Sequence, residues 1–301
     1  MISLAVAILV VAAAMRQAPP PGYVPERVYD TRRGAFSDFE VMLADVAAAD
    51  VVLVGEQHDD PNTHRLEAAI LEGLSRRRAA ATVSLEMFER DVQGAVDAYL
   101  ASRTDEPAFL AASRPWPRYA TDYKPLVDLA IASRWPVVAA NVPRKYASMV
   151  AKSGLSALDS LPPAERAHIA REIQCPLDGY FDRFAETMNS HPMPGADKQT
   201  DAERRATSER YYFAQCIKDE TMAESIASAV ESRAGRPGAV VHYNGAFHTD
   251  FGAGVAERVR RRLPSKRVVV ISILPVDSLD TLAPQGDDLK RADFLIYTTK
   301  P

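Results

Sequence analysis

The chain has 301 residues, of which 47% are hydrophobic and 25% are charged, as is typical of a globular protein with a buried core. Its 36 Lys and Arg against 40 Asp and Glu give a net charge of −4, so it lacks the strong positive field that nucleic-acid binding requires. Only two cysteines are present, Cys175 and Cys216, which excludes a disulfide-rich scaffold and any four-cysteine zinc or iron–sulfur site. The composition predicts a folded domain without a nucleic-acid partner.

The N-terminal residues 2–15 form an apolar run without charge. The run is shorter than the ~20 residues that a membrane-spanning helix needs, and small residues follow it, as in a secretory signal. We predict a signal peptide over 1–18 and a Pro-rich linker over 19–34, although no Lys or Arg precedes the run and a buried N-terminal helix would have the same composition. Because no cysteine follows the run, we expect an exported periplasmic or extracellular protein that is not lipid-anchored.

Six short apolar runs are typical of buried strands. They are Val51–Val54, Thr82–Met87, Pro136–Ala140, Ala239–Tyr243, Val268–Ile273 and Phe294–Thr298. Helical patterns separate them, the first beginning with the capping residue Asp60 and Pro61, and others following at about 91–101, 123–134 and 144–152. The order predicts an α/β fold over 35–301, with a mostly parallel β-sheet flanked by helices.

The third and fourth of these strands are too far apart in the sequence for a single crossover helix. We predict a helical insertion subdomain at about 155–234, packed at the C-terminal edge of the sheet. Its expected helices are Ala164–Ile173 and Asp201–Ser232, with a break near His191–Gly195. Cys175 and Cys216 both fall in the insertion. In an exported protein we expect a disulfide between two of its helices, and in a cytosolic one two buried thiols.

Polar residues follow the predicted strands, at the edge of the sheet where open α/β folds bind ligands. The candidate cluster at this rim comprises Glu56, His58, Glu86, Asn141, His242 and His248. Carboxylates and imidazoles that converge in this way suit a divalent metal ion or acid–base chemistry. The alternatives are that Glu56 caps a helix, that His58 lies in a turn and that His242 is a core histidine. His64 and Glu67, three residues apart on a helix, are expected to form a surface pair.

An aromatic, proline-stiffened segment over 115–125 is a second candidate. Tyrosinate is a known haem-iron ligand, and flat aromatic rings pack against porphyrins, so Tyr119 and Tyr123 are candidate ligands. Arg144 could meet an anionic group such as a haem propionate. The alternatives are an aromatic lid on the sheet edge and an arginine that is simply solvated.

Several segments resemble the ChaN-like proteins of the haem-binding uptake (Tiki) superfamily. They occur in the expected order over roughly residues 35–275 and are Val51–Pro61 with His64, Ser84–Phe88, Tyr123–Val127, Ala139–Arg144, Lys218–Ala223 and Asn244–His248. The resemblance implies an exported bacterial protein with an α/β domain and a helical subdomain that acts in haem or iron acquisition. It further implies haem held by a tyrosine, here Tyr123 or Tyr119, with two haems stacked between the protomers of a homodimer.

The sequence departs from that family in one respect, because the lipoprotein members carry an anchoring cysteine that this chain lacks. More distant relatives use a similar Gly-Glu-x-His motif in metal-dependent hydrolysis or esterase chemistry. The alternative function is therefore a metal-dependent hydrolase that uses Glu56, His58, Glu86 and His248. The Gly-x-Ser-x-Gly motif is absent, which disfavours a nucleophile-elbow hydrolase.

Overall fold

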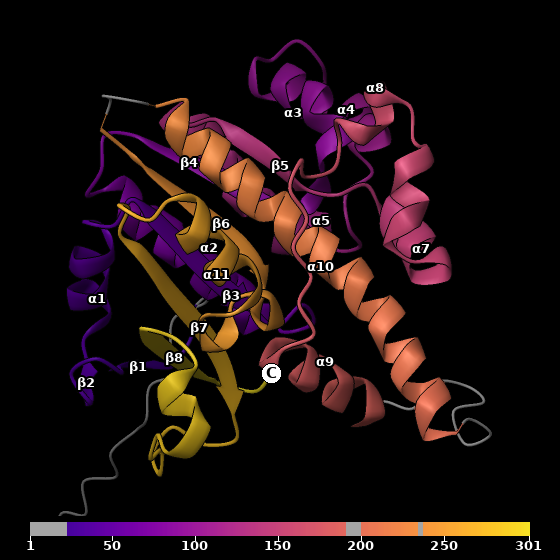
Figure 1. Ribbon diagram of the computed structural model, residues 1–301. Coiled ribbons are helices and arrows are strands. Elements are labelled where there is room, and N and C mark those ends of the chain that lie inside the picture. The colour runs from indigo at the N-terminus through magenta and orange to yellow at the C-terminus, as the bar shows by residue number, and fades with distance from the viewer. Residues whose placement is uncertain (1–22, 191–199, 234–236) are drawn as a thin grey trace, which may run out of the picture.

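The computed structural model describes residues 23–190, 200–233 and 237–301, so the predicted signal peptide and the break near His191–Gly195 lie outside the described residues. Eight strands form one sheet in the order β2-β1-β8-β7-β3-β6-β4-β5 (Figure 1). Their bounds are β1 Glu26–Asp30, β2 Ala35–Ser37, β3 Val51–Glu56, β4 Ala81–Glu89, β5 Val137–Asn141, β6 Ala239–Gly245, β7 Val268–Val276 and β8 Phe294–Thr299. All six predicted strands are present.

The strand pairing confirms the predicted fold class. β3 lies between β6 and β7 and is parallel to both, and β4, β5 and β8 continue the parallel sheet on either side. β1 is antiparallel to β8 and to β2. These first two strands were not predicted, and β1 falls inside the predicted linker of 19–34. Its five residues include Glu26, Arg27 and Asp30, so it lacks the apolar run that marks the buried strands.

Helices connect the strands. The α-helices are α1 Phe39–Val46, α2 Pro61–Ser75, α3 Gln93–Leu100, α4 Glu106–Ser113, α5 Tyr119–Asp122, α6 Lys124–Ser133, α7 Arg144–Ser153, α8 Pro163–Arg166, α9 Gly179–Ser190, α10 Asp201–Glu231 and α11 Gly254–Arg262. The 3-10 helices are η1 Arg90–Val92, η2 Leu155–Ser160, η4 Ala246–His248, η5 Asp250–Gly252 and η6 Gly286–Lys290.

The start of α2 is as predicted, because the Asp60 carboxylate accepts hydrogen bonds from the backbone N–H groups of Asn62 and Thr63.

One predicted helix is much shorter than expected. Instead of running over Ala164–Ile173, α8 ends at Arg166, and the guanidinium of Arg166 donates to the carbonyls of Ile169 and Ala170 in the turn that follows. The backbone N–H of Ala170 donates to the Thr221 side chain of α10. Contacts with a distant helix therefore override the local helical propensity.

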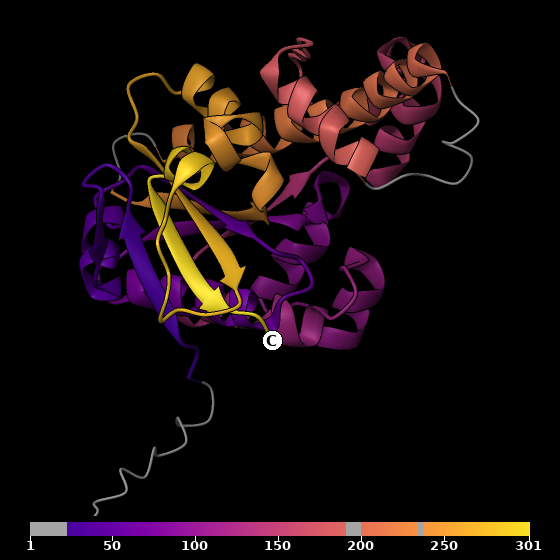
Figure 2. The same ribbon diagram turned by 90° about the horizontal axis from the view of Figure 1, so that it is seen from below.

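Helices cover both faces of the sheet (Figure 2). On one face, alternate β3 residues Val52 and Val54 pack with residues of α1, α2 and α6. On the other face, Val51 and Leu53 pack with residues of α10 and α11. Because both faces are buried, every residue of β3 lies in the interior, which explains the unbroken apolar run in the sequence.

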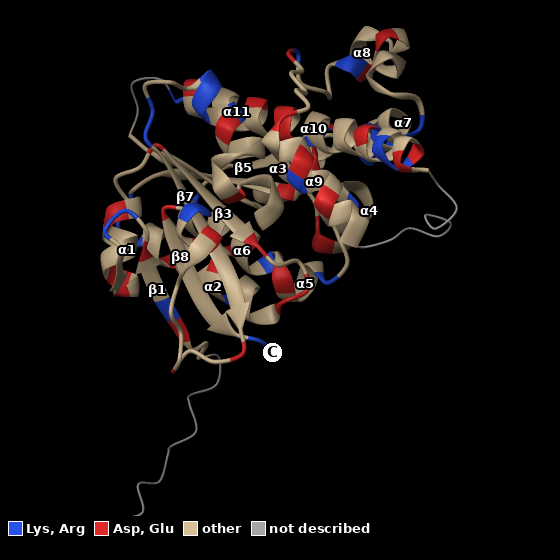
Figure 3. Ribbon diagram, turned by 60° about the horizontal axis from the view of Figure 1, so that its bottom comes forward, with Lys and Arg blue, Asp and Glu red and all other residues tan. Residues whose placement is uncertain are grey.

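The contact between α10 and α11 includes a fully buried carboxylate. Glu220 of α10 accepts hydrogen bonds from Arg261 and Arg262 in the basic last turn of α11 (Figure 3), and it lies 3.2 Å from the guanidinium of Arg258. The three cations replace the hydration that the carboxylate loses on burial.

A disulfide joins Cys175 and Cys216, as expected for an exported protein, but not between two helices. Cys216 lies on α10, whereas Cys175 lies in the irregular segment before α9. The bond ties the start of α9 to α10, which places α9 beside the carboxyl ends of the strands (Figure 1). No helix among the described residues is long and apolar enough to cross a bilayer, α10 included.

Candidate functional site

A cavity of about 520 Å³ opens at the carboxyl ends of β3, β4 and β6. From these strand ends it is lined by Glu56, Gln57, His58, Glu86, Gly245, Ala246, Phe247 and His248, and from other segments by Trp116, Phe184, Thr187, Met188, Gln215, Lys218, Asp250 and Arg291. Four of the six residues predicted for the rim cluster thus meet at one cavity. They are Glu56, His58, Glu86 and His248.

His58 is the most accessible of these four residues, with 47% of its side chain exposed. Its Nδ1 lies 2.5 Å from Oε1 of Glu56, and the ring of Trp116 packs edge-on at 5.1 Å between centroids. Burial opposes protonation, but the hydrogen bond with Glu56 and the charge of Glu86 raise the pKa of His58 above its ordinary value. A Cβ at Gly245 would lie 2.7 Å from Nε2 of His58, so only glycine at this position leaves room for the His58 ring.

His248 lies between two carboxylates, those of Asp219 and Glu86. Its Nδ1 lies 2.5 Å from Asp219 and its Nε2 lies 3.3 Å from Glu86. Although burial disfavours the charged form, the carboxylates of Glu86 and Asp219 raise the pKa of His248 to about 9. The same ion pair lowers the pKa of Glu86, whose other oxygen accepts a hydrogen bond from the Gly245 backbone. His248 is therefore an imidazolium at neutral pH.

A second polar cluster is buried behind the cavity. Nδ1 of His64 lies 2.9 Å from Glu67 and 3.4 Å from Glu56. Both side chains of the predicted surface pair, His64 and Glu67, are buried. The pairing of His64 with Glu67 is confirmed, but its surface location is wrong, because α2 turns this side toward β3 and the aromatic segment, where the ring of Tyr123 packs edge-on against His64. Burial and the neighbouring charges of Glu56 and Asp122 raise the pKa of Glu67 well above its ordinary value.

The remaining predicted site residues lie outside the lining of the cavity. Asn141 is buried and its side chain accepts a hydrogen bond from the backbone of Val142. His242 is a core histidine whose Nδ1 lies 2.9 Å from the Ser84 hydroxyl, and burial lowers its pKa to about 3.

The predicted haem-contacting residues are spread over three environments. Tyr123 is buried, and its hydroxyl donates to Glu56 at 3.1 Å. Tyr119 is buried against Phe88 and Phe109. Arg144 is exposed at the start of α7. Their role in haem ligation stays a prediction.

The sequence analysis missed the contribution of the insertion to the cavity. Gln215 and Lys218 of α10 and Phe184 and Met188 of α9 line the cavity, and Asp219 of α10 bonds to His248 from behind the lining. The only signal in the sequence was the segment Lys218–Ala223, which is one of the segments that resemble the ChaN-like proteins.

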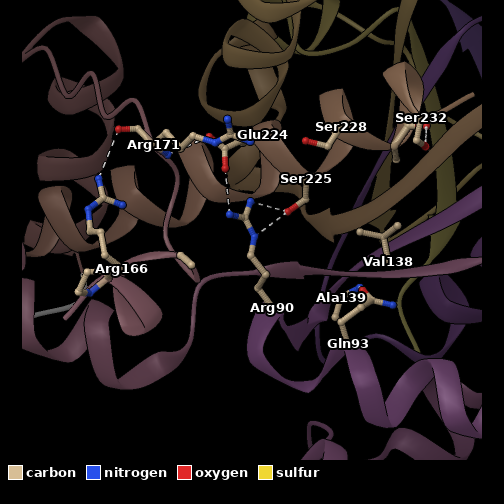
Figure 4. Close-up of a pocket in the computed structure, with 13 residues that line it drawn as sticks. Arg90, Gln93, Val138, Ala139, Arg166, Arg171, Glu224, Ser225, Ser228 and Ser232 are labelled. Atoms are coloured by element: carbon tan, nitrogen blue, oxygen red, sulfur yellow. Dashed lines mark hydrogen bonds and ion pairs between the residues drawn. The ribbon is translucent and has the colours of Figure 1, made fainter. Parts of the chain in front are cut away.

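A larger cavity, of about 870 Å³, lies between α10, β5 and the segment around α8 (Figure 4). Its central cation is already satisfied, because Arg90 donates to Glu224 at 3.0 Å and to the hydroxyl of Ser225. Arg166 is bonded to backbone carbonyls. These internal pairs leave the strand-end cavity as the better candidate for ligand chemistry.

Comparison with protein families identifies the chain. Residues 42–259 match the profile described as "Haem-binding uptake, Tiki superfamily, ChaN". The chain belongs to this family. A comparison with curated proteins gave no significant match.

Among solved structures, ChaN of Campylobacter jejuni, described as binding haem cofacially, superposes on this ChaN-family chain with a TM-score of 0.68 at 18% identity. The match covers 91% of this chain and 97% of the Campylobacter chain, which confirms the fold. A protein from Bacillus cereus has a TM-score of 0.48 at 12% identity, covering 86% of this chain and 91% of that one. The erythromycin esterase EreC has a TM-score of 0.45 at 12% identity, covering 92% and 83%. Similarities as weak as the last two carry no argument about function.

Proposed function

We propose that this protein binds haem in the strand-end cavity and that it is an exported protein of haem or iron acquisition. The observation that carries the proposal is the lining of one cavity by flat apolar side chains, a half-exposed imidazole and cations. The family to which the chain belongs is one of haem binding, and the solved ChaN structure is described as binding haem.

The cavity has the size and the surface that a porphyrin needs. Its volume of about 520 Å³ falls within the range of ligand pockets, and Trp116, Phe184, Phe247 and Met188 offer apolar contact. Lys218 lies on the same lining, where it can meet a propionate of the haem, whereas Arg291 is already paired with Asp250 and Asp288. Haem would supply an iron centre whose properties depend on the axial ligand.

His58 is the residue best placed to be that ligand. Its Nδ1 is bonded to Glu56, which orients the ring and increases the basicity of the other nitrogen. Glycine at position 245 leaves room for the His58 ring in this orientation. Tyr123 and Tyr119 remain the alternative ligands, and either one would have to bring a buried hydroxyl into the cavity. In both tyrosines burial raises the pKa, which opposes formation of the tyrosinate.

Export has separate support. The apolar run over 2–15 has the composition of a secretory signal. The Cys175–Cys216 disulfide suits an oxidising compartment. Fractionation of cells that produce the full chain, with mass spectrometry of the mature N-terminus, tests this part of the proposal, and an intact N-terminus in the cytosolic fraction would refute it.

Haemin titration tests the binding. Wild-type protein should bind haemin with a saturable Soret band. His58→Ala should abolish or shift that band, while Tyr119→Phe and Tyr123→Phe leave it unchanged. Loss of the band in one tyrosine variant alone would move the ligand to that tyrosine. No saturable binding by the wild type would refute the function.

The alternative is a hydrolase, and a specific observation favours it. His58 and His248 each have Nδ1 bonded to a carboxylate at the same cavity, an arrangement that suits an imidazole for acid–base catalysis. In this reading His58 deprotonates a water molecule, and the His248 imidazolium stabilises developing negative charge. Turnover of simple esters that is lost in His58→Ala would support it, and sensitivity to a chelator would show whether the reaction depends on a metal.

A further inference from the structure

We propose that Glu56, His64 and Glu67 form a buried binding site for a divalent first-row transition-metal cation, behind the strand-end cavity. Glu56 ends β3, and His64 and Glu67 lie on the first two turns of α2. One nitrogen or oxygen from each residue lies within 4.8 Å of the others. The site is separate from the haem proposal and does not depend on it.

The charge of this cluster requires a cation or extra protons. The side chains of Glu56, His64 and Glu67 are at most 3% exposed. Among the described residues, Oε2 of Glu56 and Oε1 of Glu67 have no hydrogen-bond partner. Two carboxylates that share a dry site cannot both stay ionised unless a positive charge lies between them.

The hydrogen bonds of His64 locate that positive charge. Its Nε2 lies 3.1 Å from the backbone carbonyl of His58, which can only accept, so Nε2 carries a proton. In a neutral ring, Nδ1 then presents a lone pair toward Glu67 and Glu56. When Glu67 carries no proton, this lone pair and the two carboxylates repel one another, and a cation at their centre turns the repulsion into coordination.

The distances agree with such a centre. Two nitrogen or oxygen atoms that bind the same tetrahedral zinc ion, each about 2.0 Å from the metal, lie about 3.3 Å from each other. Nδ1 of His64 lies 2.9 Å from Glu67 and 3.4 Å from Oε2 of Glu56. Nε2 also lies 3.5 Å from Asp122, so the outer nitrogen faces a carbonyl and a carboxylate, as is usual for a metal-binding histidine.

The donors also select the class of metal. One imidazole nitrogen with carboxylate oxygens suits Zn²⁺, Mn²⁺ or Co²⁺, whereas Mg²⁺ and Ca²⁺ prefer oxygen donors alone. Glu56 would use Oε2 for the metal and keep Oε1 for His58 and Tyr123. The metal would therefore fix the carboxylate that orients the imidazole of the cavity.

Metal titration of the chelator-treated full chain tests the site. We expect wild-type protein to take up one equivalent of Zn²⁺, and Co²⁺ in its place to give the visible absorption of a four-coordinate site. At a hundredfold excess over the dissociation constant, Zn²⁺ should raise Tm by about 5 °C. Glu67→Gln and His64→Gln should weaken uptake by about 100-fold or more and abolish the rise in Tm.

The matched control is Glu86→Gln, which alters a buried carboxylate of the cavity outside the trio. It should keep the Zn²⁺ uptake of the wild type. No uptake by the wild type, uptake retained in Glu67→Gln, or uptake lost in Glu86→Gln alone would each overturn the site. Without metal, Glu67→Gln should be at least as stable as the wild type, because a neutral amide replaces a carboxyl group whose charged form burial disfavours. If Glu67→Gln does not fold, the loss of uptake in His64→Gln and the Co²⁺ spectrum of the wild type decide.

Discussion

His248 makes the stability of the protein depend on pH in a defined window. In the unfolded chain its pKa is about 6.5, and in the fold Glu86 and Asp219 raise it to about 9. The imidazolium therefore contributes stability that is fully present below about pH 6.5 and is lost as the pH rises through about 9. The difference between the two pKa values corresponds to about 3 kcal/mol of unfolding free energy.

Urea unfolding between pH 6 and pH 10, without reductant, measures this contribution. The comparison is between wild-type protein and His248→Gln, because other groups that titrate in this range affect both chains alike. The free-energy difference between them should shrink by about 3 kcal/mol from pH 6 to pH 10. In the wild-type protein the lowered pKa of Glu86 places the loss of its contribution at acid pH, outside this window.

A difference between the two chains that stays constant from pH 6 to pH 10 would refute the reasoning. It would mean that His248 is neutral in the folded protein at every pH tested. The contacts with Asp219 and Glu86 would then be ordinary hydrogen bonds.

Three further predictions concern stability and use the same unfolding assay. Replacing Cys175 and Cys216 by serine opens a loop with a sequence separation of 41 and should cost about 4 kcal/mol; an unchanged midpoint would show that the bond adds nothing. Glu220→Gln should cost about 3 kcal/mol because it leaves the surrounding arginines uncompensated, and a loss below 1 kcal/mol would contradict the buried pairing. Gly73→Ala should cost about 1–3 kcal/mol, since the new Cβ would lie 2.3 Å from Cδ1 of Leu43, and a neutral effect would mean that α1 and α2 separate easily.

The strands were predictable because burial on both faces leaves a direct trace in the sequence. Val51–Val54 is apolar at every position, and β3 is buried at every position. β1 and β2 leave no such trace, since they are short and partly exposed at one edge of the sheet. The end of α8 was not predictable either, because Arg166 and the neighbouring helix determine it.

The candidate site was predictable only along the strand ends. The spacing of Glu56 and His58, and the rule that ligands bind at the carboxyl ends of parallel strands, located the cavity. Asp219 could not be assigned to it, because nothing local shows which turn of a long helix passes over the sheet. The i, i+3 spacing of His64 and Glu67 predicted their contact but not their burial, which depends on the packing of Tyr123.

The position of β3 in the sheet has a consequence for synthesis of the chain. Its two hydrogen-bonding neighbours, β6 and β7, begin at Ala239 and Val268, in the last third of the sequence. While the ribosome is still translating the middle of the chain, β3 has no strand to pair with and its apolar side chains have no second layer. Closure of the sheet must therefore wait for the last third of the chain, and until then β3 is a segment with a risk of aggregation.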